Sequence, residues 1–485
     1  MYKIIKILIV ITLLLGSAIT YINPIVSAEE DSNWNKIKQR GELRVGLSAD
    51  YAPLEFEKIK NGKTDYAGVD IELAKKIAKD NHLKLKNINM QFDSLLGALK
   101  TGKIDVIISG MTTTPERKKE VDFTEPYMMT NNVMLVKKSD KNKYKDLKDF
   151  TGKKIAAQKG TDQEKIAHNE IKDSQVSSLN RLPESILALK SGKVVGTIVE
   201  KPVGEAYLKQ NPELEFADVK FNEEKKPTCI AVPKNSPILL KHLNQTIDEV
   251  NNKNLIDKYM NQAAQDMQDD GNFFTKYGSF FIKGIKNTIL ISLVGVILGS
   301  ILGAFIALLK IIKFKPLSWL ASIYIEFLRG TPMLVQVFIV FFGTTAALGL
   351  DVSALICGTI ALIINSSAYI AEIIRAGINA VDKGQMEAAR SLGLNYIQTM
   401  KSVIMPQAIN NILPALGYDF VTLIKESSIV STIGVGEIMF NAQVVQGISF
   451  DPFTPLIVAA VLYFILTFAL SRIMSLVEGR MKASD

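Results

Sequence analysis

The most specific chemistry in the sequence centres on Arg117, which follows the run Ser-Gly-Met-Thr-Thr-Thr-Pro-Glu at 109–116. Its planar guanidinium can bind a carboxylate through two parallel hydrogen bonds. Gly110 and Thr112, at the end of a predicted strand, can add a backbone and a hydroxyl donor. Glu200 ends a second predicted strand and can accept hydrogen bonds from an ammonium group. This set would hold a small ligand that carries both charges; the alternative is a surface ion pair between Arg117 and a neighbouring glutamate.

Metal, cofactor and nucleotide chemistry have weaker signals. The two cysteines, Cys229 and Cys357, lie in different regions, and the three histidines stand apart from any Cys or His at ligand spacing. We therefore expect no disulfide framework, no metal site and no cofactor. Residues 97–103 fit the phosphate-loop pattern GxxxxGK, but Ile104 follows where Ser or Thr is required, and the glycines lie within and at the end of a predicted helix. We interpret this segment as structural, so any ATP chemistry is expected from another subunit.

Length and charge limit the class of protein. At 485 residues the chain is too long for one compact domain. Lys and Arg number 57 against 49 Asp and Glu, and the net charge of +8 is spread along the chain, so no nucleic-acid partner is expected. Residues 29–272 are rich in charge, whereas residues 273–485 are apolar and charge-poor, which argues against a purely cytosolic protein.

The charge-rich region has the pattern of an α/β fold. Residues 42–47 alternate as a strand does, residues 70–79 carry one apolar helix face, and a buried strand is predicted at 105–108. This alternation predicts a mostly parallel sheet. The helix–strand stretch SLLGALKTGKIDVII at 94–108 returns as SILALKSGKVVGTIV at 185–199, so we expect two similar lobes.

Residues 41–265 resemble the polar amino-acid-binding proteins of ABC transporters. The resemblance rests on Gly-Val-Asp-Ile at 68–71, the run at 109–118, Asp-Phe-Thr-Glu-Pro-Tyr at 122–127 and Gly-Thr at 160–161. It implies an amino-acid ligand between two lobes joined by two crossovers, with lobe 1 at about 41–129 and 229–268 and lobe 2 at about 135–222. The implied ligand-binding residues are Ser48, Tyr51, Phe92, Gly110, Thr112, Arg117, Gln158, Thr161 and Glu200.

The expected roles within this set follow from side-chain chemistry. Arg117 is expected to bind the ligand carboxylate and Glu200 its ammonium group, one from each lobe. Tyr51 and Phe92 are expected to flank the aliphatic stem of the ligand.

Specificity depends on the residues that face the ligand side chain. Where glutamine-binding relatives carry an acid near the first strand, this chain has Ser48, and where many carry a lysine in lobe 2, it has Gln158. Without the first-strand acid a cationic ligand is less favoured, although Asp50, Glu55 and Asp162 leave that open. Glutamine is the first expectation, followed by glutamate, asparagine or cystine.

The charge-poor region predicts an all-α membrane domain. Uncharged stretches of about 20 residues, the length that crosses the hydrocarbon core, recur along it. Lys and Arg gather at 310–329, 375–401 and 472–482, so these stretches are expected on the cytoplasmic side, although three lysines before the first span break the pattern. We predict five spans, at about 285–309, 328–349, 353–374, 403–424 and 453–474.

The segment after the third predicted span carries a second resemblance. Glu387-Ala388-Ala389, followed by Gly393 and by Val-Ile-Met-Pro at 403–406, is similar to the EAA loop of ABC importer permeases. The resemblance implies a cytoplasmic loop at 376–402 that docks on a separate ATPase subunit, with Glu387, Ala388 and Gly393 as coupling residues.

Two ionisable residues, Lys425 and Glu426, lie beside the fourth predicted span. Such residues near lipid usually have a function. We expect them either to line a translocation path or to form a structural ion pair on the cytoplasmic side.

The N-terminus has the pattern of an export signal. Lys3 and Lys6 precede an apolar run, and small residues at 26–28 mark a cleavage site before Glu29. An uncleaved anchor helix is the alternative, and both interpretations place the next domain outside the cytoplasm. The expected organisation is a signal peptide at 1–28, a binding domain at 29–268, a linker at 269–284 and a membrane domain at 285–485.

The whole chain is therefore expected to be the receptor and permease of an ATP-driven amino-acid importer, a multi-pass protein in the cell membrane of a Gram-positive type of bacterium. A homodimer is expected, because one five-helix unit makes half a pathway in the family that it resembles. A ligand-gated channel with a two-lobed sensor is the alternative, but it needs a pore loop where this chain has the EAA pattern. A cell-wall enzyme would need an exported catalytic domain, and no segment is left for one, so no enzymatic activity is expected.

Overall fold

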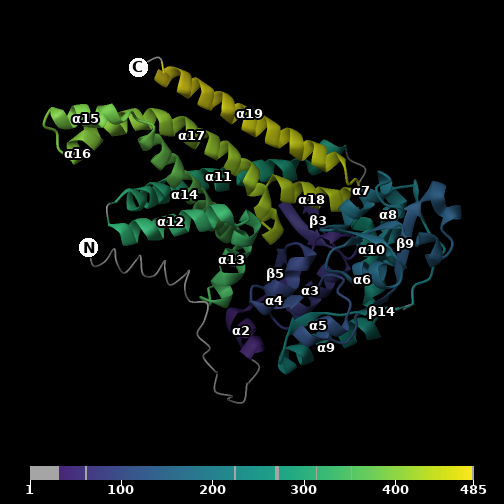
Figure 1. Cartoon of the computed structure of the whole chain (residues 1–485). Helices are drawn as coiled ribbons and strands as arrows, with labels where there is room; N and C mark the ends of the chain where they lie inside the picture. Colours follow the sequence, from purple (N-terminus) through teal and green to yellow (C-terminus); the bar gives the residue numbers. More distant parts are fainter. Residues whose placement is uncertain are drawn as a thin grey trace.

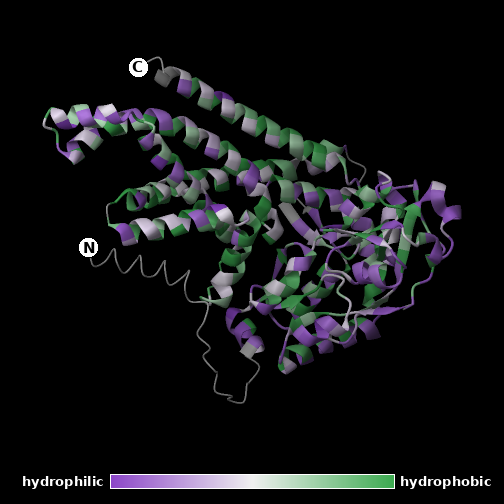
Figure 2. Ribbon diagram, viewed as in Figure 1, coloured by the Kyte–Doolittle hydropathy of each residue, from purple (hydrophilic) through white to green (hydrophobic). Residues whose placement is uncertain are grey.

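The computed structural model describes residues 32–60, 63–222, 225–267, 272–312, 314–350 and 352–482. They form two parts in contact with each other: a part of mixed helices and strands that ends at residue 267, and an all-helical part that begins at residue 272 (Figure 1). Hydrophobic residues dominate much of the helical part, whereas hydrophilic residues cover the outer helices of the mixed part (Figure 2). The predicted signal peptide at 1–28 lies outside the described residues.

Lobe 1 of the mixed part is built on a five-stranded sheet in the order β5-β1-β6-β15-β7. Parallel pairing joins β1 (Glu42–Leu47) to β5 (Lys84–Asn89) and to β6 (Val106–Ile107), whereas β15 (Ala231–Pro233) runs antiparallel to β6 and to β7 (Val121–Phe123). The prediction of a mostly parallel sheet is thus confirmed for β1, β5 and β6. The helices of this lobe are α2 (Ser32–Arg40), α3 (Val69–Asp80), η1 (Phe92–Ser94), α4 (Leu95–Lys100), α5 (Pro115–Glu120), α9 (Pro237–Asn252) and α10 (Leu255–Met267).

Lobe 2 has a second five-stranded sheet, in the order β11-β10-β12-β9-β13. Its strands are β9 (Asn132–Lys137), β10 (Lys154–Gln158), β11 (Gln175–Leu179), β12 (Gly196–Glu200) and β13 (Leu214–Phe216). β10 pairs in parallel with β11 and β12, and β9 returns antiparallel to β12. The helices are η2 (Lys138–Lys143), η3 (Leu147–Phe150), α6 (Asp162–Asn169), α7 (Leu182–Lys190) and α8 (Lys201–Gln210).

The repeated sequence stretch folds in the same way in both lobes. In lobe 1 it forms α4, a turn at Gly102 and then β6; in lobe 2 it forms α7, a turn at Gly192 and then β12. Both glycines have left-handed backbone angles, with φ of 72° and 76°. Glycine takes this conformation without the steric cost that a Cβ would add, so the same residue ends both helices.

The chain passes between the lobes through two strands that lie side by side. β8 (Met128–Thr130) leads into lobe 2 and pairs antiparallel with β14 (Lys226–Thr228), which leads back. These two short strands form the hinge between the lobes. A separate three-stranded sheet, formed by β2 (Asp50–Tyr51), β3 (Glu55–Lys60) and β4 (Lys63–Ala67), belongs to lobe 1.

The helical part begins earlier than the sequence predicts. Its first helix, α11 (Phe273–Ile311), is capped by Asn272, so residues 273–284 of the predicted linker are the first turns of a helix. The apolar pattern could not show this, because these turns carry lysines. The other helices are α12 (Lys315–Gly330), α13 (Met333–Ala346), α14 (Ala354–Asn379), α15 (Lys383–Ser391), α16 (Tyr396–Thr399), the π-turn η4 (Met400–Ile404), α17 (Met405–Glu426), the 3₁₀ turn η5 (Ser427–Ile433), α18 (Ile438–Ser449) and α19 (Thr454–Lys482).

Within the described residues, three helices, α11, α14 and α19, are long and apolar enough to cross a membrane. The number rises to five if each of two bent pairs is one span: α12 with α13, bent by 108°, and residues 396–433 with α18, bent by 49°. The second predicted span, 328–349, therefore does not exist as one straight helix. It is interrupted at Pro332, which has no N–H to continue the helix and disfavours helical geometry in the residue before it.

The two longest central helices, α11 and α14, approach each other closely through small residues. Gly295, Gly299 and Gly303 recur at every fourth position of α11. Gly299 and Gly303 face α14, whereas Gly295 lies nearer to Leu423 of α17 than to α14. A Cβ at Gly303 would lie 2.8 Å from the Ser367 carbonyl oxygen, which is too close for any other residue. Such small-residue stripes allow the dispersion contacts and backbone approach that hold helices together in lipid.

The arrangement predicts which loops of the helical part lie on each side of the membrane. The loop after α13 lies beside lobe 1, whereas α15 and α16 lie at the far end of the helical part (Figure 1). A Leu348→Cys variant should therefore react with an impermeant thiol reagent from the side of the mixed domain, and a Gln385→Cys variant should react only from the other side. Cys229 and Cys357 are buried, so the background should be low. Reaction of both variants from one side would contradict this topology.

Candidate functional site

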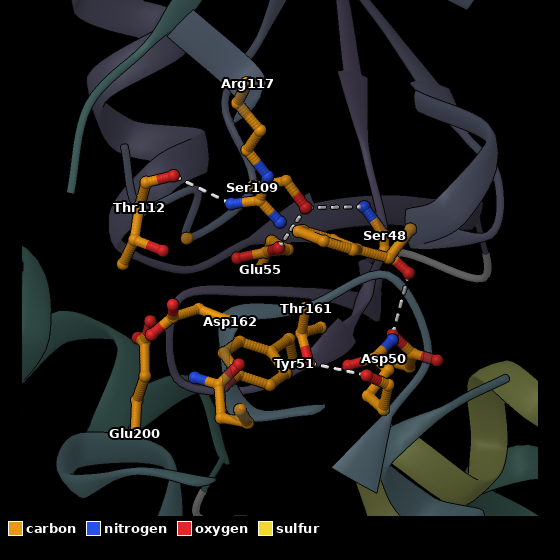
Figure 3. Close-up of a pocket in the computed structure, with 14 residues that line it drawn as sticks. Ser48, Asp50, Tyr51, Glu55, Ser109, Thr112, Arg117, Thr161, Asp162 and Glu200 are labelled. Carbon is orange, nitrogen blue, oxygen red and sulfur yellow. Dashed lines mark hydrogen bonds between the residues drawn. The ribbon is translucent and has the colours of Figure 1, made fainter. Parts of the chain in front are cut away.

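A pocket between the two lobes brings together all nine predicted ligand-binding residues (Figure 3). Lobe 1 contributes six of them and lobe 2 contributes Gln158, Thr161 and Glu200. The pocket is narrow, with a volume of about 20 Å³, so entry of an amino acid requires the lobes to move apart at the hinge. Five further residues line it that were not in the predicted set, namely Asp50, Glu55, Ser109, Asp162 and Gln163.

Arg117 lies at the boundary between the lobes rather than on the surface. Its Nη1 donates to the Thr112 carbonyl of lobe 1 at 2.7 Å, and its Nη2 donates to the Gly160 carbonyl of lobe 2 at 2.9 Å. The guanidinium also lies 5.4 Å from the Phe92 ring centroid. Burial lowers the pKa of Arg117, but a guanidinium stays charged in proteins. The side chain is therefore a buried cation, held by neutral carbonyls and an aromatic face, that faces the pocket.

The alternative of a surface ion pair for Arg117 is wrong. Arg117 is only 6% exposed. Glu116 instead pairs with Lys165 of lobe 2 at 2.5 Å, and Glu120 pairs with Lys100 at 3.2 Å. Thr114 caps α5 by accepting a hydrogen bond from the Arg117 N–H, which directs the arginine side chain inward.

Glu200 ends β12 on the lobe 2 side of the pocket and is 2% exposed. Its Oε2 atom has no hydrogen-bond partner within the part of the chain that the structure describes. Burial, followed by the nearby carboxylates of Asp70 and Asp162, raises the pKa of Glu200 to about 8, against the opposing effect of Arg117. A buried carboxylate of this kind is completed by a cationic donor, as the ammonium group of an amino acid would be.

The other acids of the pocket already have partners. Asp50 pairs with Arg181 at 2.8 Å, and both side chains are fully buried. Asp162 pairs with Lys226 of the hinge at 2.6 Å.

Glu55 is compensated in a different way, through a hydrogen bond and a proton. It accepts a hydrogen bond of 2.6 Å from Ser109, and burial together with the neighbouring Asp70 raises its pKa well above the usual range. The raised pKa favours the neutral form of Glu55, whose Oε2 atom, like that of Glu200, has no hydrogen-bond partner among the described residues. None of these pairings could be read from sequence spacing, because the partners are 15 to 131 residues apart.

Two predicted roles need correction. The backbone N–H of Gly110 donates to the Asp70 carboxylate at 2.6 Å, so it is not an open donor for a ligand. Gly110 has a φ of 53° and lies against Tyr51 and Leu54, which explains the glycine. The Thr161 hydroxyl is occupied as well, because it donates to the Gln158 carbonyl and caps α6.

Ser48 and Gln158 line the pocket, and their contact with the ligand side chain stays a prediction. The Ser48 hydroxyl donates to Asp50 at 2.9 Å, and the Gln158 amide donates to the Asn180 carbonyl at 3.3 Å. Tyr51 and Phe92 supply the aromatic walls of the pocket. No group of three or more possible metal ligands occurs in the described ranges, and no residue of the pocket suggests a cofactor.

Comparison with known proteins gives each part a family. Residues 43–266 match the bacterial extracellular solute-binding proteins, family 3. Residues 274–483 match the binding-protein-dependent transport system inner membrane component.

Individual relatives agree. The chain is 42% identical over 206 residues to the arginine transport system permease protein ArtQ of Bacillus subtilis, a match that covers 42% of this chain and 94% of that protein. It is 40% identical over 205 residues to a protein from Rickettsia bellii named for glutamine transport, with 42% and 94% covered. The chain belongs to the amino-acid ABC importers. It combines the substrate-binding protein and the membrane permease of such an importer in one polypeptide.

Among solved structures, an amino-acid ABC transporter substrate-binding protein of Streptococcus pneumoniae bound to L-arginine is 37% identical to this chain. The match has a TM-score of 0.47 and covers 48% of this chain and 98% of that one. The importer subunit is a transport protein rather than an enzyme, as its permease relatives indicate.

In the permease, the predicted coupling residues lie far from the receptor. Glu387 and Ala388 are exposed on α15, and Gly393 follows it with a φ of 87°. The helix–turn–helix that they form is at the opposite end of the importer from the two lobes (Figure 1).

Lys425 and Glu426 end α17, which runs from the coupling segment toward the receptor. The structure records no ion pair between them among the described residues, and they do not lie at the α15 end, so the cytoplasmic ion pair is not supported. A place in the translocation path stays a prediction.

We expect Glu200 to strengthen ligand binding while it lowers the stability of the ligand-free protein. A Glu200→Gln variant keeps the shape of the protonated acid but cannot ionise to meet the ligand ammonium. We expect amino-acid affinity to fall by roughly a hundredfold, the cost of removing one partner of a buried charge pair. Calorimetry on the full-length protein measures this, with Glu205→Gln, an exposed glutamate of α8, as the matched control. Unchanged affinity would contradict the ammonium role.

The same variant should change stability with pH. The folded-state pKa of Glu200, about 8, lies above its ordinary value of 4.5. The contribution of wild-type Glu200 to the free energy of unfolding is therefore fully present below about pH 4.5. It is lost as the pH rises toward 8. In the absence of ligand, Glu200→Gln should raise the melting temperature more at pH 8 than at pH 5, whereas Glu205→Gln should not.

Proposed function

We propose that this importer takes up a polar amino acid with a neutral side chain, and that glutamine is its substrate. The observation that carries the proposal is the charge balance of the pocket. Asp50 and Asp162 are already paired with basic residues, and burial next to Asp70 raises the pKa of Glu55, which favours its neutral form. Arg117 and Glu200 then remain to bind the carboxylate and ammonium that every amino acid carries.

The residues expected at the side-chain end support an amide. Ser48 and Gln158 are neutral groups that both donate and accept hydrogen bonds, which matches the donor and acceptor of a glutamine or asparagine amide. Glutamate would bring another carboxylate next to Glu55 and Asp162, so we expect it to bind more weakly.

Arginine is the second candidate, because one of the relatives is named for arginine transport. A guanidinium would need a carboxylate that is not already neutralised. Asp162 could provide it if Lys226, which forms an ion pair with it at 2.6 Å, were displaced.

This reasoning predicts how specificity can be changed. Removing the cation in Lys226→Met should leave Asp162 uncompensated and raise the affinity for arginine relative to glutamine by roughly tenfold, the effect of one charged hydrogen bond. Calorimetry of the full-length protein with both amino acids measures the ratio. Lys225→Met, at an exposed neighbouring lysine, is the control. If the wild-type protein binds arginine more tightly than glutamine, the substrate assignment is wrong.

Transport is proposed to be driven by a separate ATPase subunit that docks on α15 and α16. Both helices are short and amphipathic, and Leu392 and Ile397 are 84% and 75% exposed beside the coupling residues. Apolar side chains exposed at the end of a loop suit a protein partner better than water. A ligand-gated channel would not need this surface, and ATP dependence of uptake separates the two functions.

The turn at Gly393 gives a test of ATPase coupling. A φ of 87° strains any residue with a Cβ, so Gly393→Val should distort the α15–α16 turn. We expect ATP-driven uptake into proteoliposomes to be lost while amino-acid binding is retained. Gly349→Val is the matched control, because Gly349 has a φ of 64° and open space around it but lies near the receptor. Equal uptake by the two variants would refute the coupling role.

Two copies of the chain are proposed to form the complete transporter, because one permease unit makes half a pathway in this family. Lys425 and Glu426 are proposed to lie along that pathway, since α17 leads from the ATPase side toward the receptor. Crosslinking of the purified importer in lipid nanodiscs tests the dimer, and a population that stays monomeric while transporting would contradict it.

A further inference from the structure

A lysine of the receptor is buried in the permease. Lys103, at the end of the GxxxxGK segment of lobe 1, is 3% exposed. Its Nζ donates to the Thr344 hydroxyl at 3.0 Å and to the Val352 carbonyl at 2.9 Å, and it lies 5.0 Å from the Phe341 ring centroid. Lysine is almost never fully buried unless it has partners. The permease therefore provides a built socket for this side chain, between the end of α13 and the start of α14.

The two glycines of the segment face the same surface. A Cβ at Gly97 would lie 3.5 Å from the Phe342 ring, and one at Gly102 would lie 3.7 Å from the Thr345 methyl group. The segment that resembles a phosphate loop in sequence thus packs against the end of α13. Its glycines and lysine are explained by contact with protein, without any nucleotide.

The internal repeat shows that this burial comes from the permease. Lobe 2 carries the same Ala-Leu-Lys-x-Gly-Lys stretch at 188–193, with the same helix, glycine turn and following strand. There the equivalent lysine, Lys193, is exposed. Because the local fold is the same, the different exposure of Lys103 and Lys193 is caused by the domain that lies against lobe 1.

Lobe 2 also meets the permease, at Phe450. Phe450, between α18 and α19, is 4% exposed, and its ring lies 4.9 Å from the Tyr207 ring in an edge-on arrangement. Its carbonyl accepts a hydrogen bond of 3.4 Å from the Asn211 amide. Tyr207 and Asn211 both belong to lobe 2, at and just after α8.

The permease also covers the junction of the two lobes. The Asp50–Arg181 ion pair joins β2 of lobe 1 to the start of α7 in lobe 2. Helix α18 lies over this pair: a Cβ at Gly447 would come within 2.7 Å of Asp50, and the Phe440 ring is 5.9 Å from the Arg181 guanidinium. Because α18 is a single helix that contacts both lobes, it can keep both contacts at only one angle between the lobes.

We propose that Lys103 anchors lobe 1 on the permease while lobe 2 is the moving lobe, which reaches Phe450 and α18 only when the receptor is closed. With lobe 1 held in its socket, opening at β8 and β14 withdraws Tyr207, Asn211 and Arg181 from the permease. The contact at Phe450 then reports closure to the membrane domain. The ligand-dependent half of this proposal rests on the proposed amino-acid binding between the lobes, whereas the anchor does not.

The anchor is tested by cutting the tether. A protease site replaces residues 268–271 in the full chain. The chain is placed in lipid nanodiscs and cleaved, and the fraction of receptor that stays bound to the permease is measured over time. Lys103→Met should release the receptor about tenfold to a hundredfold faster than wild type, the effect of losing hydrogen bonds from a buried charge. Lys193→Met, the matched lysine of the repeat, should be retained as wild type. Retention of the Lys103→Met receptor at the wild-type level would overturn the anchor.

A permease-side variant keeps this test independent of receptor folding. Thr344→Val removes one acceptor of the socket and leaves the receptor sequence unchanged, so it should also speed release, by about tenfold. If only Lys103→Met released the receptor, and glutamine binding to that variant were lost as well, the release would reflect unfolding and the anchor would be refuted.

The moving lobe is tested by distance. In the uncleaved chain, one fluorophore is attached to the permease through Leu348→Cys. The second fluorophore is attached through Lys119→Cys in lobe 1 or, in a separate variant, through Lys193→Cys in lobe 2. Glutamine should change the distance from lobe 2 and leave that from lobe 1 unchanged, and Glu200→Gln should abolish the change. Equal changes for both lobes would overturn the proposal. Absence of any ligand binding by calorimetry would instead refute the proposed substrate and leave the retention result for the anchor intact.

Discussion

The guanidinium of Arg117 joins the two lobes, because it donates one hydrogen bond to a carbonyl of each, Thr112 and Gly160. A cation in this position is costly to bury, and neutral carbonyls compensate it only in part. A ligand carboxylate would complete its environment. The closed arrangement of the receptor, and therefore the shape of the pocket and the contact with the permease, depends on how this one charge is satisfied.

The rest of the pocket follows the same constraint. The carboxylates of the pocket are buried between the lobes, where a charged group needs a counter-charge or is favoured in its protonated form. Asp50 and Asp162 are paired with basic residues, and burial next to Asp70 raises the pKa of Glu55. Glu200 keeps one oxygen without a hydrogen-bond partner among the described residues, which is a cost to stability. Groups that weaken the ligand-free protein in this way are often those that a ligand completes.

The importer connects this pocket to the membrane through rigid contacts. The interlobe ion pair lies beneath α18, and the adjoining Phe450 packs on lobe 2. The permease itself is packed closely along the glycine stripe of α11, where Gly303 lies against the Ser367 carbonyl. A change of angle between the lobes is therefore felt at the permease surface, because neither partner can deform to absorb it.

The sequence by itself determined the two-part organisation and much of the pocket. The resemblance carried by the motifs around Arg117 implied nine residues that the fold brings together, whereas five further lining residues were not in that set. Only the tertiary structure decided which of their groups are open to a ligand. The Gly110 N–H is taken by Asp70, 40 residues away, and Asp50 is taken by Arg181, 131 residues away. The same limit applies to Lys103 and Lys193, which have the same local sequence but different exposure, because burial depends on a domain that begins more than 100 residues later in the chain. Spacing and periodicity describe a strand or a helix, whereas pairing across the fold is set by packing.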